Sequence, residues 1–292
     1  MNSMNEFVYP EIKSGLYLVS LPVGCLSDIS FRALHMLSNS DYIAGEDTRS
    51  VRSLFKLLKI SKSIKSIISY HDHSSSHTRE KIIDLIRQGK SVALVSDAGT
   101  PLISDPGYKL VKTVIEEGFE VFSVPGPSSV IAALTVSGLP TDTFSFLGFL
   151  PNVKSKKKKL LETYLTLGSS LIVFESGKRL QKTLELLAEN CRPSTEMCIC
   201  RELTKLHEEV TRFKAQEGIK VTKKMRSLKG EFVIIVGKSE AGDFDLKNLD
   251  EQLRKIKKSM SMKDSVDFLA EKLNIPKKII YKKALTMFKD NN

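Results

Sequence analysis

Residues 95–110 read VSDAGTPLISDPGYKL, and this stretch decides the fold of the chain. An apolar, strand-like run stops at Asp97, and two turns rich in Gly and Pro separate it from the apolar positions of a following helix. Glycine lets backbone approach a neighbour closely and proline fixes the loop. The stretch therefore predicts a strand, a constrained loop and a helix, with the loop forming one wall of a ligand site.

The same alternation continues on both sides of this stretch. Strands are predicted at residues 16–21, 41–45, 66–70, 91–97 and 120–125, each followed by a helical pattern. Ser27 or Asp28 is expected to cap the first helix, which would bury Phe31, Leu34 and Leu37. Strands that alternate with helices predict an α/β unit with a largely parallel sheet, at residues 14–140.

Two further units are predicted downstream. Residues 150–239 form a second α/β unit, with strands at 170–176, within TEMCICREL and at 230–237. After an acidic, linker-like segment, residues 253–290 read as two helices around NIP, a helix-turn-helix-like module that is marginally stable alone and is expected to dock on another surface. A length of 292 residues agrees with two or three compact units.

The charge of the chain favours a polyanionic partner. The net charge is +11 and the pI is about 9.3. Five lysines lie within residues 154–159, and from Leu253 onward 11 Lys and Arg face 4 Asp and Glu, a local +7. A solvated surface explains either segment alone, but two such segments together make contact with RNA or DNA plausible.

Other classes of protein are disfavoured. No apolar run approaches the roughly 20 residues that span a bilayer, and the N-terminus lacks a signal pattern, so a cytoplasmic protein without membrane contact is expected. The four cysteines form no CxxC pair and are expected to be reduced. The segment HDHSSSH (71–77) lacks the further ligands of a zinc site, so no metal is predicted.

Four loops at the carboxyl ends of predicted strands are candidates for a binding site. They read LPVGCLSD, GEDTR, SDAGTPLISDPG and VPGPSS. In an open parallel sheet, ligands bind outside these strand ends, so the loops should converge on one edge. The chain has no phosphate loop, no GxGxxG fingerprint and no GxSxG elbow. Spacing alone thus predicts a small-molecule cleft and nothing narrower.

The loops and their surroundings resemble a known family. The segments are LYLVSLPVGCLSDISFRAL, IAGEDTRS, SYHDHSSSHTRE, VALVSDAGTPLISDPGYKLV, FSVPGPSSVIAALTVSGLPTDTFSFLGFLP and VFESGKRLQKTLELLAE. Together they resemble the bacterial ribosomal RNA small-subunit methyltransferase I family, from about Gly15 to Gly237. The resemblance implies the tetrapyrrole methylase fold, two α/β domains with a cleft between them and a small C-terminal helical module. It also implies 2′-O-methylation of a decoding-centre cytidine in 16S rRNA with S-adenosylmethionine, and a homodimer.

Roles for individual residues follow from the resemblance. Backbone groups of the second domain would recognise adenine. The residues that match the family's cofactor site are Pro22, Gly24, Asp97, Gly99, Thr100, Pro101, Ile103, Ser104, Ser128, Ser129, Ala132, Ala133, Phe174, Leu203 and Glu231. Asp97 and Asp105 would either contact the cofactor or substrate directly or only fix the geometry of their loop, since an aspartate that ends a strand is often only a turn-former.

Proton removal from the ribose hydroxyl needs a base, since this hydroxyl is a very weak acid. Glu46, Asp47, Arg49 and His71 are the candidate catalytic residues. Glu46 or Asp47 would act as base or orienting group, and Arg49 would bind a phosphate or carboxylate. The alternative is that Asp47 and Arg49 form a buried pair that only shapes the loop.

The chain departs from the family pattern at two places. Residues 21–26 read LPVGCL where the family usually has TPIGNL, and residues 71–74 read HDHS where an HE-N pattern is expected. Two alternatives therefore stay open. One is a small-molecule tetrapyrrole methylase on the same fold, and the other is a non-catalytic, RNA-binding ribosome-assembly factor. Calorimetry with S-adenosylmethionine discriminates the second, since such a factor need not bind the cofactor.

Overall fold

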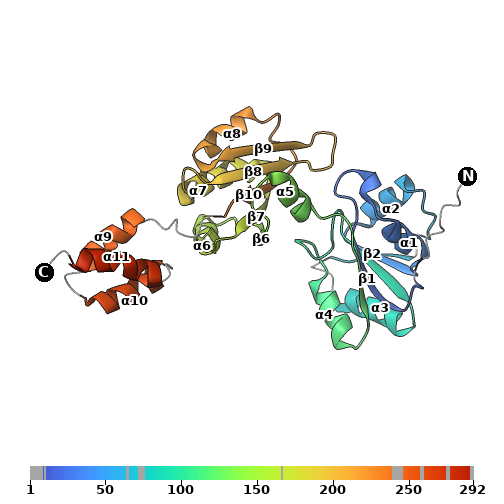
Figure 1. Ribbon diagram of the computed structural model, residues 1–292. Coiled ribbons are helices and arrows are strands. Elements are labelled where there is room, and N and C mark those ends of the chain that lie inside the picture. Colours follow the sequence, from blue (N-terminus) through green and yellow to red (C-terminus); the bar gives the residue numbers. More distant parts are fainter. Residues whose placement is uncertain are drawn as a thin grey trace, which may run out of the picture.

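The structure is a computed structural model that describes residue 9 and residues 11–63, 66–71, 76–165, 167–238, 246–256, 260–273 and 277–289. It contains two separate five-stranded sheets, each with helices against it, and a C-terminal group of three helices (Figure 1). The predicted α/β class, with two sheets and C-terminal helices, is confirmed. Within the described ranges, no helix is long and apolar enough to cross a membrane.

The first sheet is wholly parallel, with the strand order β3-β2-β4-β1-β5. Every residue of the central strand β4 is buried, because both faces of the sheet are covered by helices. Its elements are β1 (Gly15–Val19), β2 (Tyr42–Gly45), β3 (Ile67–Ser69), β4 (Ser91–Val95), β5 (Val121–Val124), the short 3-10 helix η1 (Leu26–Asp28), α1 (Phe31–Asn39), α2 (Thr48–Leu57), α3 (Ser76–Arg87) and α4 (Tyr108–Glu116).

Helices α1 and α2 cover one face of this sheet, and α3 and α4 cover the other (Figure 1). The first helix starts later than predicted. Ser30 caps it by accepting a hydrogen bond from Ala33 N at 3.0 Å, while residues 26–28 form the separate turn η1. Phe31 is consequently 62% exposed, which corrects the expectation that it is buried. The buried side of α1 consists of Ala33, Met36 and Leu37.

Helix α5 (Ser129–Ser137) follows β5 but packs on the second sheet. Its side chains Val130, Ala133 and Leu134 are buried in a cluster with residues of that sheet. Arg212 donates hydrogen bonds to the carbonyls of Val136 and Ser137 and so satisfies the end of the helix. Residues 14–140 were predicted as one unit, yet the packing of α5 ties this last helix to the second sheet.

The second sheet is mixed, with the order β6-β7-β10-β8-β9 and a single parallel pair, β6 with β7. Apolar side chains fill both of its faces, one against α5 and the other against α6, α7 and α8. Its elements are β6 (Phe144–Phe149), α6 (Lys154–Leu165), β7 (Ser170–Ser176), α7 (Gly177–Asn190), β8 (Glu196–Arg201), β9 (Glu209–Lys214), the 3-10 helix η3 (Ala215–Glu217), α8 (Gly218–Lys224) and β10 (Glu231–Val236).

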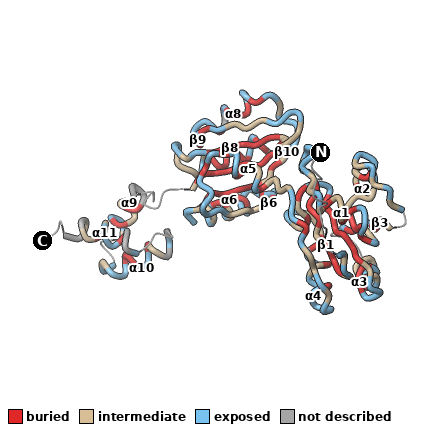
Figure 2. Tube along the Cα trace, turned by 45° about the vertical axis from the view of Figure 1, so that its right-hand side comes forward, coloured by how far each residue is buried: buried red, intermediate tan, exposed pale blue. Residues whose placement is uncertain are grey.

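The C-terminal helices α9 (Leu246–Ile256), α10 (Met262–Leu273) and α11 (Lys277–Lys289) have a core of their own. Figure 2 shows this core as a small group of buried segments apart from those of the two sheets. Helix α9 was not predicted, because it starts at Leu246 inside the segment that reads as an acidic linker. The predicted connection NIP lies outside the described residues.

Candidate functional site

Three loops at the carboxyl edge of the first sheet are tied together by hydrogen bonds. Leu21 N donates to Gly99 O at 2.8 Å and Gly99 N donates to Leu21 O at 3.1 Å, which joins the loops after β1 and β4. The Thr100 hydroxyl donates to Pro127 O at 3.0 Å and accepts from Ser20 Oγ at 3.2 Å. Thr100 therefore fixes the loops after β1, β4 and β5 relative to one another, and the predicted convergence of these loops is confirmed.

Strained backbone is concentrated in two loops. Leu102 (φ 72°) and Ser104 (φ 67°) lie in the loop after β4, and Glu202 (φ 50°) and Thr204 (φ 61°) lie in the loop after β8. Non-glycine residues with positive φ persist where the surroundings over-determine them, and they cluster at functional sites. The two strained loops belong to different sheets, so the site is expected between them.

The two units touch at two points beside these loops. A Cβ on Gly24 would lie 2.5 Å from Lys205 Cγ and 2.9 Å from Leu203 O, so only glycine fits there. Cys25 N also donates to Thr204 Oγ1 at 3.0 Å. At the second point, a Cβ on Gly148 of β6 would lie 2.8 Å from Ser104 Oγ.

A cavity lies between the two units, with walls from both. Its lining contains many of the residues predicted to bind the cofactor, namely Asp97, Gly99, Thr100, Ile103, Ser104, Ser128, Ser129, Phe174 and Glu231. The remaining lining residues are Val23, Ala98, Asp105, Phe149, Phe232 and Val233. Phe149 had no sequence signal of its own. It enters the cavity because the pairing of β6 shifts register between Phe146 and Phe149, at a Gly148 with φ 61°.

Other predicted cofactor residues lie outside the lining. Gly24 forms one of the two contacts between the units, and Pro22 and Pro101 lie in the loops after β1 and β4. Ala132, Ala133 and Leu203 pack in the apolar layer between α5 and the second sheet, where Ala133 is fully buried and Leu203 is 6% exposed. Their small or apolar side chains thus position α5 rather than line the cavity.

The cavity offers different chemistry on its two sides. On the first-unit side, Ser128 precedes α5 and its side chain makes no capping hydrogen bond, so its hydroxyl and the first N–H groups of α5 can serve a ligand. On the other side, Phe149 is 57% exposed and packs edge-to-face on Phe174 with ring centroids 5.6 Å apart. From the first unit, Ile103 of the loop after β4 is 42% exposed and adds apolar surface next to these rings. Such a site suits a ligand with one polar, charged end and one flat apolar end.

Asp105 is the lining carboxylate with the most perturbed acidity. Partial burial raises its pKa to about 6, the negative charges of Glu46 and Asp97 add to the rise, and a hydrogen bond from Ser96 opposes it. Like charges close together disfavour ionisation of one of them. The predicted catalytic residue Glu46 is therefore brought near the cavity, through Asp105.

The other predicted catalytic residues lie at the same edge in different settings. Asp47 caps α2 by accepting from Arg49 N at 2.8 Å, and its carboxylate pairs with the Arg49 guanidinium at 2.7 Å. This pair lowers the pKa of Asp47 to about 2, which makes it a weak base. The pair is not buried as the alternative supposed, because the Arg49 side chain is 86% exposed. His71 is exposed in the loop after β3.

A buried polar network lies in the interior of the second unit, next to the strand that contributes Phe174 to the cavity. Glu175, directly after Phe174, points into the interior, where its carboxylate accepts from Thr183 Oγ1 at 2.6 Å and pairs with Arg179 Nε at 3.1 Å. Lys157 Nζ donates to Thr183 Oγ1 at 3.0 Å and lies 4.0 Å from Glu175. Lys157 is only 7% exposed, so it cannot be part of the predicted basic surface formed by residues 154–159.

Arg201 is a further buried charged residue of the second unit. Its guanidinium donates to the carbonyls of Lys229 at 2.8 Å and His207 at 3.0 Å, and the residue is 6% exposed. Arg201 thereby connects the loop before β10 with the loop after β8. Within the described part of the chain, no group of three or more His, Cys, Asp and Glu side chains could hold a metal ion.

Comparison with known sequences gives one consistent result. A model of the tetrapyrrole (corrin/porphyrin) methylases matches residues 15–218. The ribosomal RNA small subunit methyltransferase I of Rickettsia prowazekii is 41% identical over 279 residues, which cover 96% of this chain and 93% of that protein. The protein of the same name from Halalkalibacterium halodurans is 40% identical over 239 residues, covering 81% of this chain and 80% of its own.

Solved structures share the fold at low identity. The methyltransferase CobJ matches with a TM-score of 0.57 and 17% identity, over 77% of this chain and 95% of its own. Diphthine synthase matches with a TM-score of 0.60 and 12% identity, over 77% and 90%. The uroporphyrin-III C-methyltransferase of Thermus thermophilus, crystallised with S-adenosylhomocysteine, matches with a TM-score of 0.53 and 17% identity, over 76% and 97%.

Proposed function

This chain belongs to the ribosomal RNA small subunit methyltransferase I family of the tetrapyrrole methylases, and from that premise we propose that it methylates 16S rRNA with S-adenosylmethionine. The proposed target is the ribose 2′-oxygen of a cytidine in the decoding centre. The observation that carries the proposal is 41% identity to a protein of that name over 96% of the chain, which includes both sheets and the C-terminal helices.

The chemistry of the cavity supports the cofactor. When bound, S-adenosylmethionine supplies an activated methyl group on a sulfonium. The hydroxyls of Ser128 and Ser129 and the first turn of α5 suit its carboxylate. The exposed side chains of Phe149 and Ile103 suit its adenine.

Asp105 is the residue we propose to take the proton from the ribose hydroxyl. It lines the cavity, and a carboxylate with a pKa near 6 is a better base at neutral pH than an ordinary aspartate. Glu46 is then a positioning residue, because its charge acts on Asp105. Asp47 and Arg49 hold the start of α2, and the exposed part of Arg49 suits a phosphate.

The proposal is tested by transfer of a labelled methyl group from S-adenosylmethionine to small ribosomal subunits and to naked 16S rRNA, with mapping of the modified nucleotide. Porphyrinoid precursors serve as the competing substrate. Incorporation at a cytidine ribose is the expected result. Incorporation into the porphyrinoid alone would contradict the proposal, and absence of cofactor binding in calorimetry would favour a non-catalytic assembly factor.

We place the protein in the cytoplasm, where its substrate is assembled, and we propose a homodimer on the basis of the family resemblance. Analytical ultracentrifugation measures the second point directly. A monomer at micromolar concentration that still transfers methyl groups would remove the dimer from the proposal without touching the activity.

A further inference from the structure

Helix α2 carries a row of basic side chains along its outer side. Arg49, Arg52 and Lys56 are spaced by three and four residues, which places them on one side of the helix, and Lys59 follows just after its end. All four are exposed. We call these four residues the α2 basic row.

Packing fixes the direction of this row. On the opposite side of α2, Val51 and Phe55 are 3% and 4% exposed within the first core. The helix therefore cannot rotate without exposing these side chains, and the α2 basic row is held toward solvent.

Acidic side chains neutralise the α2 basic row less than they neutralise basic residues on α3 and α4. Arg87 on α3 pairs with Glu80 and Asp84 at 2.7 Å each, and Lys112 on α4 lies 3.6 Å from Glu116. Helix α2 contains no Asp or Glu between Thr48 and Leu57. Among the described residues, the ion pairs of the α2 basic row are limited to Arg49 with Asp47.

The row starts at the candidate site. Helix α2 begins at the carboxyl end of β2, next to Glu46, whose charge acts on Asp105 in the cavity. From Arg49 to Lys59 the row extends about 15 Å at the rise of a helix. It leads from the cavity edge along the outside of the first unit, over a distance that covers several phosphates of one strand.

We propose that the α2 basic row binds the phosphate backbone of the rRNA strand next to the methylated nucleotide. This inference rests on the proposed function and adds a binding surface to it. The exposed Ser53 lies on the same side and supplies a further hydrogen-bond donor for phosphate.

The chemistry of the row favours RNA over two other partners. A protein interface has an apolar centre, whereas the α2 basic row has only the 66% exposed Leu57 at its margin. A membrane-surface helix keeps its apolar face free for lipid, but that face of α2 is buried in the core.

The test compares two triple variants of the full chain. Arg52→Gln/Lys56→Gln/Lys59→Gln removes the row but leaves Arg49 in place. Lys220→Gln/Lys223→Gln/Lys224→Gln is the matched control, since these three lysines are exposed on α8, which also lacks acidic residues and packs on α7 in the second unit (Figure 1). Binding to a 16S rRNA transcript and to small ribosomal subunits is measured by fluorescence anisotropy over a salt series, and S-adenosylmethionine binding by calorimetry.

The α2 variant is expected to lose about 10- to 100-fold in affinity for the transcript, with the salt slope reduced by about 2, as follows from the loss of three phosphate contacts. Its KM for RNA rises, while kcat and cofactor affinity stay near those of the wild type. The α8 control is expected to keep the wild-type slope.

Three results would overturn the inference. They are an unchanged salt slope, an equal loss in the α8 control, and a loss confined to subunits with normal binding to the transcript, which would point to a ribosomal protein. Wild-type protein that binds the transcript but transfers no methyl group would instead refute the proposed function. It would not contradict the inference that the α2 basic row binds the phosphate backbone.

Discussion

Substitution of Asp105 distinguishes two roles for this residue, a structural role as a turn-former and a catalytic role as a general base. As a turn-former it would tolerate Asn, whereas as a base it would not. We predict that Asp105→Asn lowers kcat by about 100-fold or more, the range for removal of a general base, with unchanged affinity for S-adenosylmethionine. Single-turnover methyl transfer and calorimetry measure the two quantities. Normal turnover in a folded variant would return Asp105 to a structural role.

The pH dependence of the wild type follows from the same carboxylate. Its pKa is raised to about 6, so the rate should fall as the pH drops through about 6 and the base becomes protonated. Because Glu46 contributes to that rise, Glu46→Gln should shift the acid limb of kcat/KM to lower pH. A profile that does not move in this variant would show that another group is the base.

The pH dependence of the free energy of unfolding provides an independent test of the raised pKa of Asp105. A carboxyl whose folded pKa lies above its unfolded value binds protons more tightly when folded, so its ionised form destabilises the fold above pH 6 and the penalty disappears as the pH falls toward 4. Since the group is only partly buried, Asp105→Asn should raise the free energy of unfolding at pH 8 by about 1 kcal/mol. Urea denaturation at pH 8 and pH 5 measures it, and a loss of stability at both would contradict the prediction.

Gly24 makes a contact that the sequence presents as an ordinary turn. Gly24→Ala would place a methyl group 2.5 Å from Lys205 Cγ and 2.9 Å from the Leu203 carbonyl oxygen, and the second of these atoms belongs to the backbone. We expect a cost of about 1 to 3 kcal/mol, expressed as weaker cofactor binding because the two walls move apart. Gly218→Ala is the control, since the nearest atom there is an ordinary 3.4 Å away.

At the scale of elements, the sequence predicts those strands and helices that a local hydrophobic pattern marks. The strands of the first sheet are short apolar runs between turn residues, because a parallel sheet is buried on both faces. Strand β9 was missed because EVTRFK is polar on most positions, as suits an edge strand, and its role depends on Arg212 reaching the end of α5. Phe149 was missed because a bulge in β6, rather than a motif, turns it into the cavity.

The lysine-rich helix α6 shows why a run of like charges should not be treated as one surface. Lys157 faces the interior and hydrogen-bonds Thr183 beside Glu175. We predict that Lys157→Ala lowers the free energy of unfolding by about 3 kcal/mol, since it leaves a buried carboxylate short of positive charge. Lys156→Ala, on the exposed side, should change it by less than about 0.5 kcal/mol. Equal effects in chemical denaturation would contradict this arrangement.

At the scale of the whole molecule, the cavity depends on how the two units are placed relative to each other. No single segment of the sequence encodes this placement. The loops of the first sheet could be predicted to converge because parallel strands end at one edge. The opposite wall comes from strands of a mixed sheet, brought into place by α5 and by the contacts at Gly24 and Gly148. The resemblance supplied residues from both walls, but it also included Ala133 and Leu203, which are packing residues.

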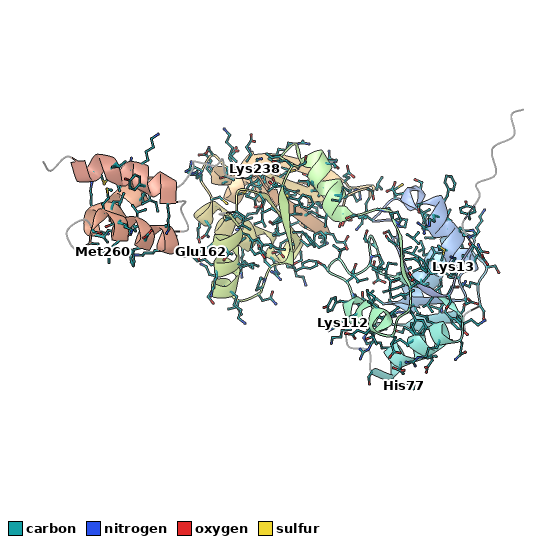
Figure 3. The ribbon with its side chains drawn as sticks, turned by 60° about the horizontal axis from the view of Figure 1, so that its bottom comes forward. Lys13, His77, Lys112, Glu162, Lys238 and Met260 are labelled. Atoms are coloured by element: carbon teal, nitrogen blue, oxygen red, sulfur yellow. The ribbon has the colours of Figure 1, made fainter. Side chains whose placement is uncertain are left out.

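The C-terminal helices allow the last prediction, which concerns the independence of that part of the molecule. Their buried residues contact one another, and in Figure 3 the side chains around Met260 gather between these helices, apart from the body that carries Glu162 and Lys238. A chain ending at Lys238 should therefore keep its cofactor affinity and its unfolding midpoint. It should bind 16S rRNA more weakly and with a smaller salt slope. The removed residues 239–292 carry 12 basic and 9 acidic residues, and the part from Leu253 onward holds 11 of the basic and only 4 of the acidic ones. Loss of cofactor binding on truncation would show instead that these helices support the cavity, and an unchanged salt slope would show that their charge serves no RNA contact.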